Sequence, residues 1–269
     1  MRAAALAILL LILGCRGAEK PVPTITLATT TSTRESGLLD VLLPIFEQTG
    51  AEVKVVAVGS GQALEMGRRG DADVLLTHAP GAEAQFVAEG YARERRPVMY
   101  NDFVLVGPET DPAGVRNEKS ISATSAQIAD GTFSFVSRGD SSGTHIKENE
   151  VWEELGIAPR GDWYIQAGSG MAQTLRMASE KRAYTLTDRG TFLSQREGLD
   201  LVILSQGDPL LRNQYAVIVV NPKKRPHANS DAAKQFAEFL IGPVAQKAIA
   251  EYGVNTFGEP LFFPQRGPE

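Results

Sequence analysis

The stretch Ala28-Thr29-Thr30-Thr31-Ser32-Thr33 joins a predicted strand to a predicted helix. Residues 24–28 alternate between polar and apolar side chains, which is typical of a half-buried strand. Residues 36–48 carry apolar side chains at helical spacing and predict a helix. A helix cap needs one hydroxyl, and five hydroxyl side chains follow one another here. We therefore expect Thr30 and Thr31 to face a ligand; the alternative is a polar turn with surplus caps.

A second segment, Ser137-Arg138-Gly139-Asp140-Ser141-Ser142-Gly143-Thr144-His145, also lies between a predicted strand and a predicted helix. Arg138 supplies a permanent, planar positive charge that suits an oxyanion, the alternative being a surface ion pair. We expect Asp140 to support Arg138 or to cap the helix rather than to touch an anion. His145 is expected to have a structural role. The start of this helix offers further hydroxyl and N–H donors, which favour an anion: Ser142, Gly143 and Thr144.

Two Gly-Ser-Gly turns resemble each other in sequence and position. Val58-Gly59-Ser60-Gly61-Gln62 and Ala167-Gly168-Ser169-Gly170-Met171 each follow a predicted strand and open a predicted helix. Glycine allows a ligand to approach the backbone closely. One such turn is weak evidence for a binding site, because many β–α turns use glycine. Two of them beside the other segments make Ser60, Ser169 and Gly170 candidate ligand contacts.

The order of elements predicts an α/β protein with two lobes. Each lobe is expected to contain a mainly parallel sheet flanked by helices. Two strong β-strand runs, residues 102–107 and 214–221, bracket the second unit and predict a hinge of two crossing strands near Phe103 and Tyr215. The expected boundaries are residues 22–104 with 216–269 for lobe 1, and residues 105–215 for lobe 2.

Composition excludes several classes of function. The chain has 269 residues, of which 43% are hydrophobic and 22% charged, and its net charge is −5. These values are ordinary for a soluble protein and argue against a nucleic-acid partner. Three histidines and one cysteine are too few to favour a transition-metal site. No nucleotide-phosphate loop of the Gly-x-x-x-x-Gly-Lys type is present.

The N-terminus is expected to be a targeting segment. Met1-Arg2 is followed by an apolar run over residues 3–13, which is too short to span a bilayer and suits a secretory signal. Ile12-Leu13-Gly14-Cys15 resembles a bacterial lipobox, so residues 1–14 are the expected lipoprotein signal peptide and Cys15 the lipidated residue. The alternative is an ordinary secretory signal that leaves a free thiol.

Together these segments resemble the tungstate-binding, substrate-binding component of bacterial ABC importers. The resemblance covers nearly all of the chain after the signal and is carried by five ordered blocks: residues 27–32, 58–61, 137–145, 167–171 and 183–191. It implies a type II periplasmic binding protein that closes over tungstate, with molybdate as a competitor. It further implies a permease and an ATPase as partners, no cofactor, no catalytic residues, a monomer, and a place in the periplasm or at the cell surface. The lipobox-like Cys15 departs from family members that have a free soluble signal, and it predicts a lipid anchor for this chain.

Two alternatives stay open on the residues alone. A site of this kind also suits another tetrahedral oxyanion, such as molybdate, sulfate or phosphate. In a different class of function, an exported serine hydrolase would use Ser141 or Ser142 with His145. Stoichiometric oxyanion binding without turnover favours the binding protein, and ester turnover that depends on either serine favours the hydrolase.

Overall fold

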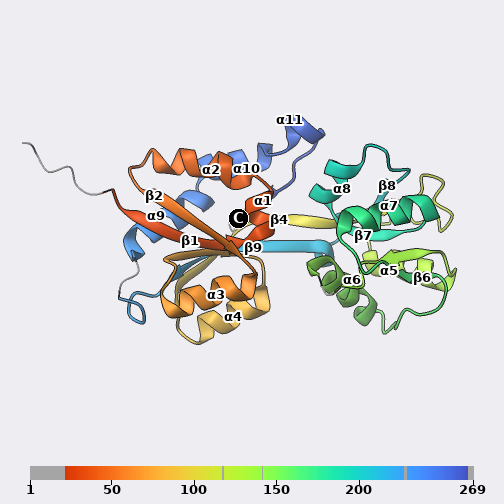
Figure 1. Ribbon diagram of the computed structural model, residues 1–269, viewed down its shortest axis with the longest axis horizontal. Coiled ribbons are helices and arrows are strands. Elements are labelled where there is room, and N and C mark those ends of the chain that lie inside the picture. The colour runs from red at the N-terminus through yellow and green to blue at the C-terminus, as the bar shows by residue number, and fades with distance from the viewer. Residues whose placement is uncertain (1–21, 117, 141, 227–228, 266–269) are drawn as a thin grey trace, which may run out of the picture.

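The computed structural model describes residues 22–116, 118–140, 142–226 and 229–265. The expected signal peptide, Cys15 and Ser141 lie outside these residues. Figure 1 shows two groups of elements joined by two long strands. No helix within the described ranges is long and apolar enough to cross a membrane.

The chain first builds most of the left-hand group of Figure 1 and then leaves it along β4. Its elements in order are β1 (Thr24–Thr30), α1 (Thr31–Glu35), α2 (Leu38–Glu47), β2 (Glu52–Val58), α3 (Ser60–Arg69), β3 (Val74–Thr77), α4 (Pro80–Ala88) and β4 (Ala92–Gly107). The right-hand group follows, with α5 (Ile121–Asp130), β5 (Phe135–Ser137), α6 (Gly143–Glu154), β6 (Tyr164–Gln166), α7 (Met171–Lys181), β7 (Thr185–Asp188), α8 (Arg189–Gln195), β8 (Val202–Ser205) and a short 3-10 helix (Pro209–Leu211). The chain returns to the left-hand group along β9 (Arg212–Val220) and ends in α9 (Ser230–Ile241), α10 (Pro243–Glu251), α11 (Val254–Phe257) and β10 (Phe263–Pro264).

The helix predicted over 36–48 is observed as α2, and a separate short helix, α1, precedes it. Helix α1 ends at Glu35 and α2 starts at Leu38, whereas Pro44 lies inside α2. The break falls at Gly37, whose φ of +78° favours glycine, and a Cβ there would lie 2.6 Å from the hydroxyl of Tyr252. The turn therefore brings the start of α2 against the C-terminal helices.

The large sheet is mixed, with the order β10-β4-β9-β3-β1-β2. Strand β1 is parallel to β2 and β3, but β9 is antiparallel to both β3 and β4. The α/β arrangement agrees with the expected class, and the sheet is less parallel than expected. The reason is that the chain leaves along β4 and returns beside it along β9, which makes the two crossing strands antiparallel neighbours.

Strand β4 changes partners near its middle. Residues 92–102 pair with β9, and residues 103–107 pair with β7 and β8. One strand thus belongs to the sheets of both groups (Figure 1). Strands β5 and β6 form a separate parallel pair in the right-hand group.

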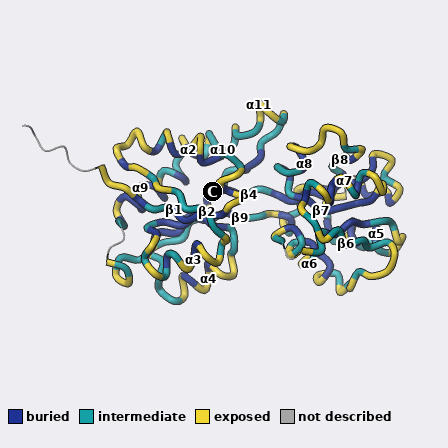
Figure 2. Tube along the Cα trace, viewed as in Figure 1, coloured by how far each residue is buried: buried dark blue, intermediate teal, exposed yellow. Residues whose placement is uncertain are grey.

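Apolar side chains fill three clusters, which appear as dark segments inside both groups in Figure 2. One lies beneath α3 and α4, and a second packs α5 and α6 against the right-hand strands. The third and largest covers the opposite face of the left-hand sheet under α2, α9 and α10, and continues along β4 to α7 and α8. The two groups therefore share apolar packing along the crossing strand.

Candidate oxyanion site

One half of the candidate site lies where β1 and β2 end side by side. Thr30 pairs with Val58 in the parallel ladder, so the helices that follow, α1 and α3, start at the same edge of the sheet. Thr31 is the first residue of α1 and is exposed, and Ser60 is the first residue of α3 and is half-buried. The structure thus brings Thr30, Thr31 and Ser60 to one edge, as the sequence predicts.

The hydroxyl of Thr30 is already engaged within its own turn. Its Oγ1 accepts the backbone N–H of Thr33 at 3.2 Å, and lies 2.6 Å from the Thr33 hydroxyl and 3.1 Å from the Ser32 hydroxyl. Thr29, by contrast, donates to the Leu76 carbonyl at 2.8 Å and ties β1 to β3. Of the five hydroxyls, that of Thr29 therefore has a structural role, whereas those of Thr30, Ser32 and Thr33 form a hydrogen-bonded cluster at the edge of the sheet.

The other half of the site is formed by two loops of the right-hand group. Residues 137–140 and 142 precede α6, and the turn Gly168–Gly170 leads into α7. The N–H of Gly168 donates to the carbonyl of Arg138 at 2.9 Å, so the two loops are directly joined. Gly139 allows this approach, because its φ is +61° and a Cβ there would lie 3.0 Å from the Cβ of Gln166.

Asp140 orients Arg138 and the start of α6 together. One carboxylate oxygen pairs with the Arg138 guanidinium, and the other accepts the backbone N–H of Ser142 at 3.1 Å. Burial alone would raise the pKa of Asp140, but the hydrogen bonds from Ser142 and Arg138 outweigh it and lower that pKa. The expected support of Arg138 by Asp140 is observed, whereas the N-cap of α6 is Ser142 and Asp140 instead accepts the N–H of that capping residue. The lowered pKa keeps the Asp140 carboxylate ionised at neutral pH.

Ser142 is the N-cap of α6, and its Oγ accepts the backbone N–H of His145 at 3.4 Å. Gly143 and Thr144 form the first turn of this twelve-residue helix. The helix dipole adds partial positive charge at the same end. The structure therefore places Ser142, Gly143 and Thr144 at the start of α6, which Asp140 links to Arg138.

Two buried polar atoms in this half have no hydrogen-bond partner among the described residues. They are the Nε of Arg138 and the Oγ of Ser169. A buried polar atom without a partner costs about 1–3 kcal/mol. A bound anion that accepted from these atoms would recover that free energy.

Five glycines of these loops have open space beside them. A Cβ added to any of them would meet no other atom within 4 Å: Gly59, Gly61, Gly143, Gly168 and Gly170. Core packing therefore does not account for these five glycines. Only Gly168 among them has a conformational reason to be glycine, its φ of +58°. Their backbone is open to a ligand.

A polar cluster on the crossing strands was missed by sequence reasoning. Asn101 of β4 and Asn213 of β9 are partners in the antiparallel ladder, and the Asn213 amide donates to the Asn101 oxygen at 2.9 Å. The Nδ1 of His78 lies 3.1 Å from the Asn213 oxygen, and burial is the main cause that lowers the pKa of His78. Tyr215 is buried, and its hydroxyl interacts with Asn101, Ser32 and Thr33. The cluster thus joins the Thr30 turn to both crossing strands.

Comparisons with known proteins agree with this fold. A family model described as a PBP superfamily domain matches residues 17–244, so the chain belongs to the periplasmic binding protein (PBP) superfamily. The tungstate-binding protein TupA of Peptoclostridium acidaminophilum is 53% identical over 243 residues, which are 89% of this chain and 85% of that protein. Within the superfamily, the chain belongs to the family of the TupA tungstate-binding proteins.

Solved structures support the same family. The tungstate-binding protein TupA from Desulfovibrio alaskensis G20 is 43% identical and has a TM-score of 0.86, with 91% of this chain and 100% of that chain covered. The structure described as the tungstate ABC transporter from Geobacter sulfurreducens is 48% identical and has a TM-score of 0.70, covering 85% of this chain and 98% of that chain. The chain is therefore related to these proteins over nearly its whole length.

Proposed function

We propose that this protein binds tungstate outside the cytoplasm and delivers it to an ABC permease. The observation that carries the proposal is the 53% identity to a tungstate-binding protein, in a chain whose candidate loops are rich in donors. Molybdate is the expected competitor because it is also a tetrahedral dianion of nearly the same size. The protein acts as a monomer and uses no cofactor.

The proposed ligand contacts come from both halves of the site. A desolvated dianion is very costly unless many donors surround it, which calls for contacts from two sides. The proposed contacts are Thr30, Thr31, Ser60, Arg138, Ser142, Gly143, Thr144, Ser169 and Gly170. Hydroxyls and N–H groups serve as donors, and Arg138 supplies the charge.

The nearby carboxylates favour a fully ionised anion. Asp140 is bonded to Arg138 and to the Ser142 N–H, and Asp188 accepts the N–H of Thr191 at 2.8 Å as the cap of α8. Both are thus engaged by protein donors. Hydrogen phosphate carries a proton that needs an acceptor, whereas tungstate and molybdate carry none. We therefore expect the site to discriminate against phosphate.

We also propose that ligand binding closes two lobes, residues 22–104 with 216–269 and residues 105–215. The change of partners in β4 between residues 102 and 103 supports a hinge there, with β9 as the second crossing near Tyr215. Closure completes the donor shell and presents a new surface to the permease.

The proposed location is the periplasm or the cell surface, with a lipid anchor at Cys15 after removal of residues 1–14. The protein is proposed to have no catalytic activity. The Ser142 hydroxyl has an evident role as the cap of α6, which accounts for it without a nucleophilic function. This supports the binding protein over the exported serine hydrolase.

Calorimetric titration of the purified protein with tungstate, molybdate, sulfate and phosphate in turn tests the function. We expect one tetrahedral dianion per protein, with tungstate and molybdate bound more tightly than sulfate and phosphate. Tight phosphate binding, or no binding of tungstate, would contradict the proposal. An ester-hydrolysis assay on the same sample is expected to show no turnover that depends on Ser142.

A further inference from the structure

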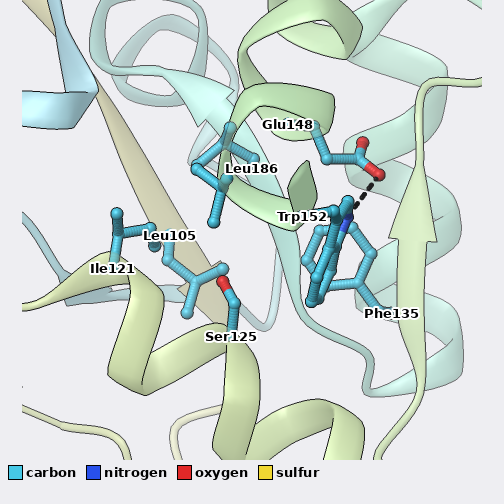
Figure 3. A pocket seen from close by; sticks show the side chains of 8 residues that line it. Leu105, Ile121, Ser125, Phe135, Glu148, Trp152 and Leu186 are labelled. Carbon is cyan, nitrogen blue, oxygen red and sulfur yellow. Dashed lines mark hydrogen bonds between the residues drawn. The ribbon is translucent and has the colours of Figure 1, made fainter. Parts of the chain in front are cut away.

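A buried carboxylate lies beneath the Arg138 loop. Glu148 is in the second turn of α6 and is only 3% exposed. Figure 3 shows it beside Trp152, above a cavity of about 10 Å³ whose walls are otherwise mostly apolar. Burying a carboxylate is costly unless donors satisfy it. Burial accordingly raises the pKa of Glu148, although hydrogen bonds from its neighbours oppose the shift.

Three donors from three different elements meet at Glu148. The indole N–H of Trp152 on α6 donates at 3.1 Å, and the hydroxyl of Tyr164 on β6 donates at 2.6 Å. The hydroxyl of Ser137, the last residue of β5, is the third and is close enough to hydrogen-bond both the Glu148 carboxylate and the Tyr164 hydroxyl. Glu148 therefore ties together the end of β5, the start of β6 and α6.

A hydrogen-bonded chain leads from this carboxylate to the loop above it. The N–H of Gly139 donates to the Oγ of Ser137 at 3.2 Å, and the Ser137 hydroxyl can in turn donate its proton to Glu148. Arg138 lies between these two residues in the sequence. The carbonyl of Ser137 also accepts the N–H of Ala167 at 2.9 Å, next to the Gly168–Arg138 bond. Ser137 thus contacts both loops of this half of the site, through its hydroxyl and through its carbonyl.

A carboxylate suits this place because it only accepts hydrogen bonds. An amide in the same position has one oxygen, which accepts hydrogen bonds, and one NH₂ group, which only donates them. It therefore cannot accept at both ends as the carboxylate does. With the amide NH₂ on the Ser137 side, the Ser137 hydroxyl would have to turn and accept from both the amide and the Gly139 N–H. The attachment of the loop backbone to α6 through Ser137 would change, and the place of Arg138 would be less firmly set.

We propose that Glu148 is a positioning residue for oxyanion binding, which acts through Ser137 and the backbone of Gly139 to set the place of Arg138 against the Gly168–Gly170 turn. This inference rests on the proposed function for its binding assay. It assigns no contact between Glu148 and the anion.

Tungstate titrations of Glu148→Gln and Ser137→Ala test the proposal. We expect each variant to bind about tenfold more weakly than the natural protein, the size of effect that loss of one good hydrogen bond produces. Val151→Ala, a buried neighbour on α6 outside the chain of bonds, is the control for simple destabilisation. After comparison of melting temperatures, Val151→Ala is expected to bind within about twofold of the natural protein. Equal loss in all three variants would contradict a positioning role.

A double-mutant cycle separates positioning from general damage. If Glu148 acts through Arg138, Glu148→Gln has little further effect on tungstate affinity in the Arg138→Ala background. Additive effects would overturn the inference. Should Glu148→Gln fail to fold, Ser137→Ala takes its place in the cycle.

Hydrogen exchange of the ligand-free protein gives a readout that does not need tungstate. Glu148→Gln is expected to speed exchange at the Gly139 and Gly168 amides, with little change in the middle of α7. Unchanged exchange at both amides would overturn the inference even if tungstate binds. Absence of tungstate binding in the natural protein, together with faster exchange in the variant, would refute the proposed function and leave the positioning of the loop in place.

Discussion

Arg138 is the only residue of the proposed ligand set that carries a full charge, and it is held in place by neighbours on both sides. Asp140 pairs with the Arg138 guanidinium, and the Arg138 carbonyl accepts a hydrogen bond from the N–H of Gly168. The Nε of Arg138 remains without a partner among the described residues. The side chain is therefore oriented before the ligand arrives, which reduces the ordering cost of binding.

Replacement of Arg138 is expected to weaken tungstate binding in two steps. Arg138→Lys keeps the charge but loses the planar fork, and Arg138→Ala loses both. A hydrogen bond to a charged group contributes about 1.5–3 kcal/mol, which corresponds to about a tenfold to hundredfold rise in Kd for the alanine variant. Calorimetry measures both values, and an alanine variant with natural affinity would remove Arg138 from the site.

At the scale of elements, the region where β4 changes partners contains a buried ion pair. The Nε of Arg189 lies 2.7 Å from Asp102 Oδ1, and its Nη2 lies 2.6 Å from Oδ2. Each side chain is 5% exposed, and Glu259 and Gln206 also bond the guanidinium. The pair joins the start of α8 to the crossing strand, and Glu259 extends the contact to the C-terminal segment.

Removal of one partner from this buried pair is expected to destabilise the protein strongly. Asp102→Asn is expected to lower the free energy of unfolding by about 3 kcal/mol, the low end of the usual range because Glu259 remains beside Arg189. Asp231→Asn is the matched control, since Asp231 is highly exposed and its contact with Arg93 is 3.4 Å. We expect the control to change stability by less than about 1 kcal/mol. Urea unfolding curves measure both, and equal effects would contradict the structural role of the pair.

The sequence predicts local features better than those that depend on strand register. The hydroxyl and glycine segments mark where strands end and helices begin, because caps and turns are decided by neighbouring residues. The role of Asp140 was predictable for the same reason. The first half of β4 was not, since Arg93, Glu94, Arg95, Arg96 and Pro97 lack the pattern of a buried strand. Their pairing depends on β9, more than a hundred residues further along the chain.

The polar cluster on the crossing strands shows the same limit. Asn101 and Asn213 meet only because β4 and β9 pair in one particular register, and no nearby motif marks either residue. Glu148 was likewise missed, because a single acidic residue in a helix more often faces solvent. Its proposed role comes from Ser137 on β5 and Tyr164 on β6, which reach the α6 carboxylate from two strands.

At the scale of the whole molecule, the two groups of elements are joined by β4 and β9 and share the apolar packing along β4 (Figures 1 and 2). Residues proposed to bind the anion lie on both sides of these strands. A ligand that contacts both sides stabilises the closed arrangement. Binding at a hundredfold excess over Kd adds about 2.7 kcal/mol to folding stability.

Membrane attachment is expected to depend on one residue outside the described ranges. Cys15→Ser is expected to release the protein from the membrane fraction while tungstate binding is kept, because stable anchoring needs the acyl chains. Fractionation followed by immunoblotting of natural and variant protein measures this. A natural protein found free in the soluble extracytoplasmic fraction would contradict the lipid anchor.

Small-angle X-ray scattering with and without tungstate tests the central claim, that an oxyanion is enclosed between two lobes. We expect the radius of gyration to fall when tungstate saturates the natural protein, and to stay unchanged for Arg138→Ala at the same tungstate concentration. Calorimetry on the same samples establishes that the ligand is bound. Identical scattering curves for the free and the saturated natural protein would contradict closure and leave only a preformed pocket.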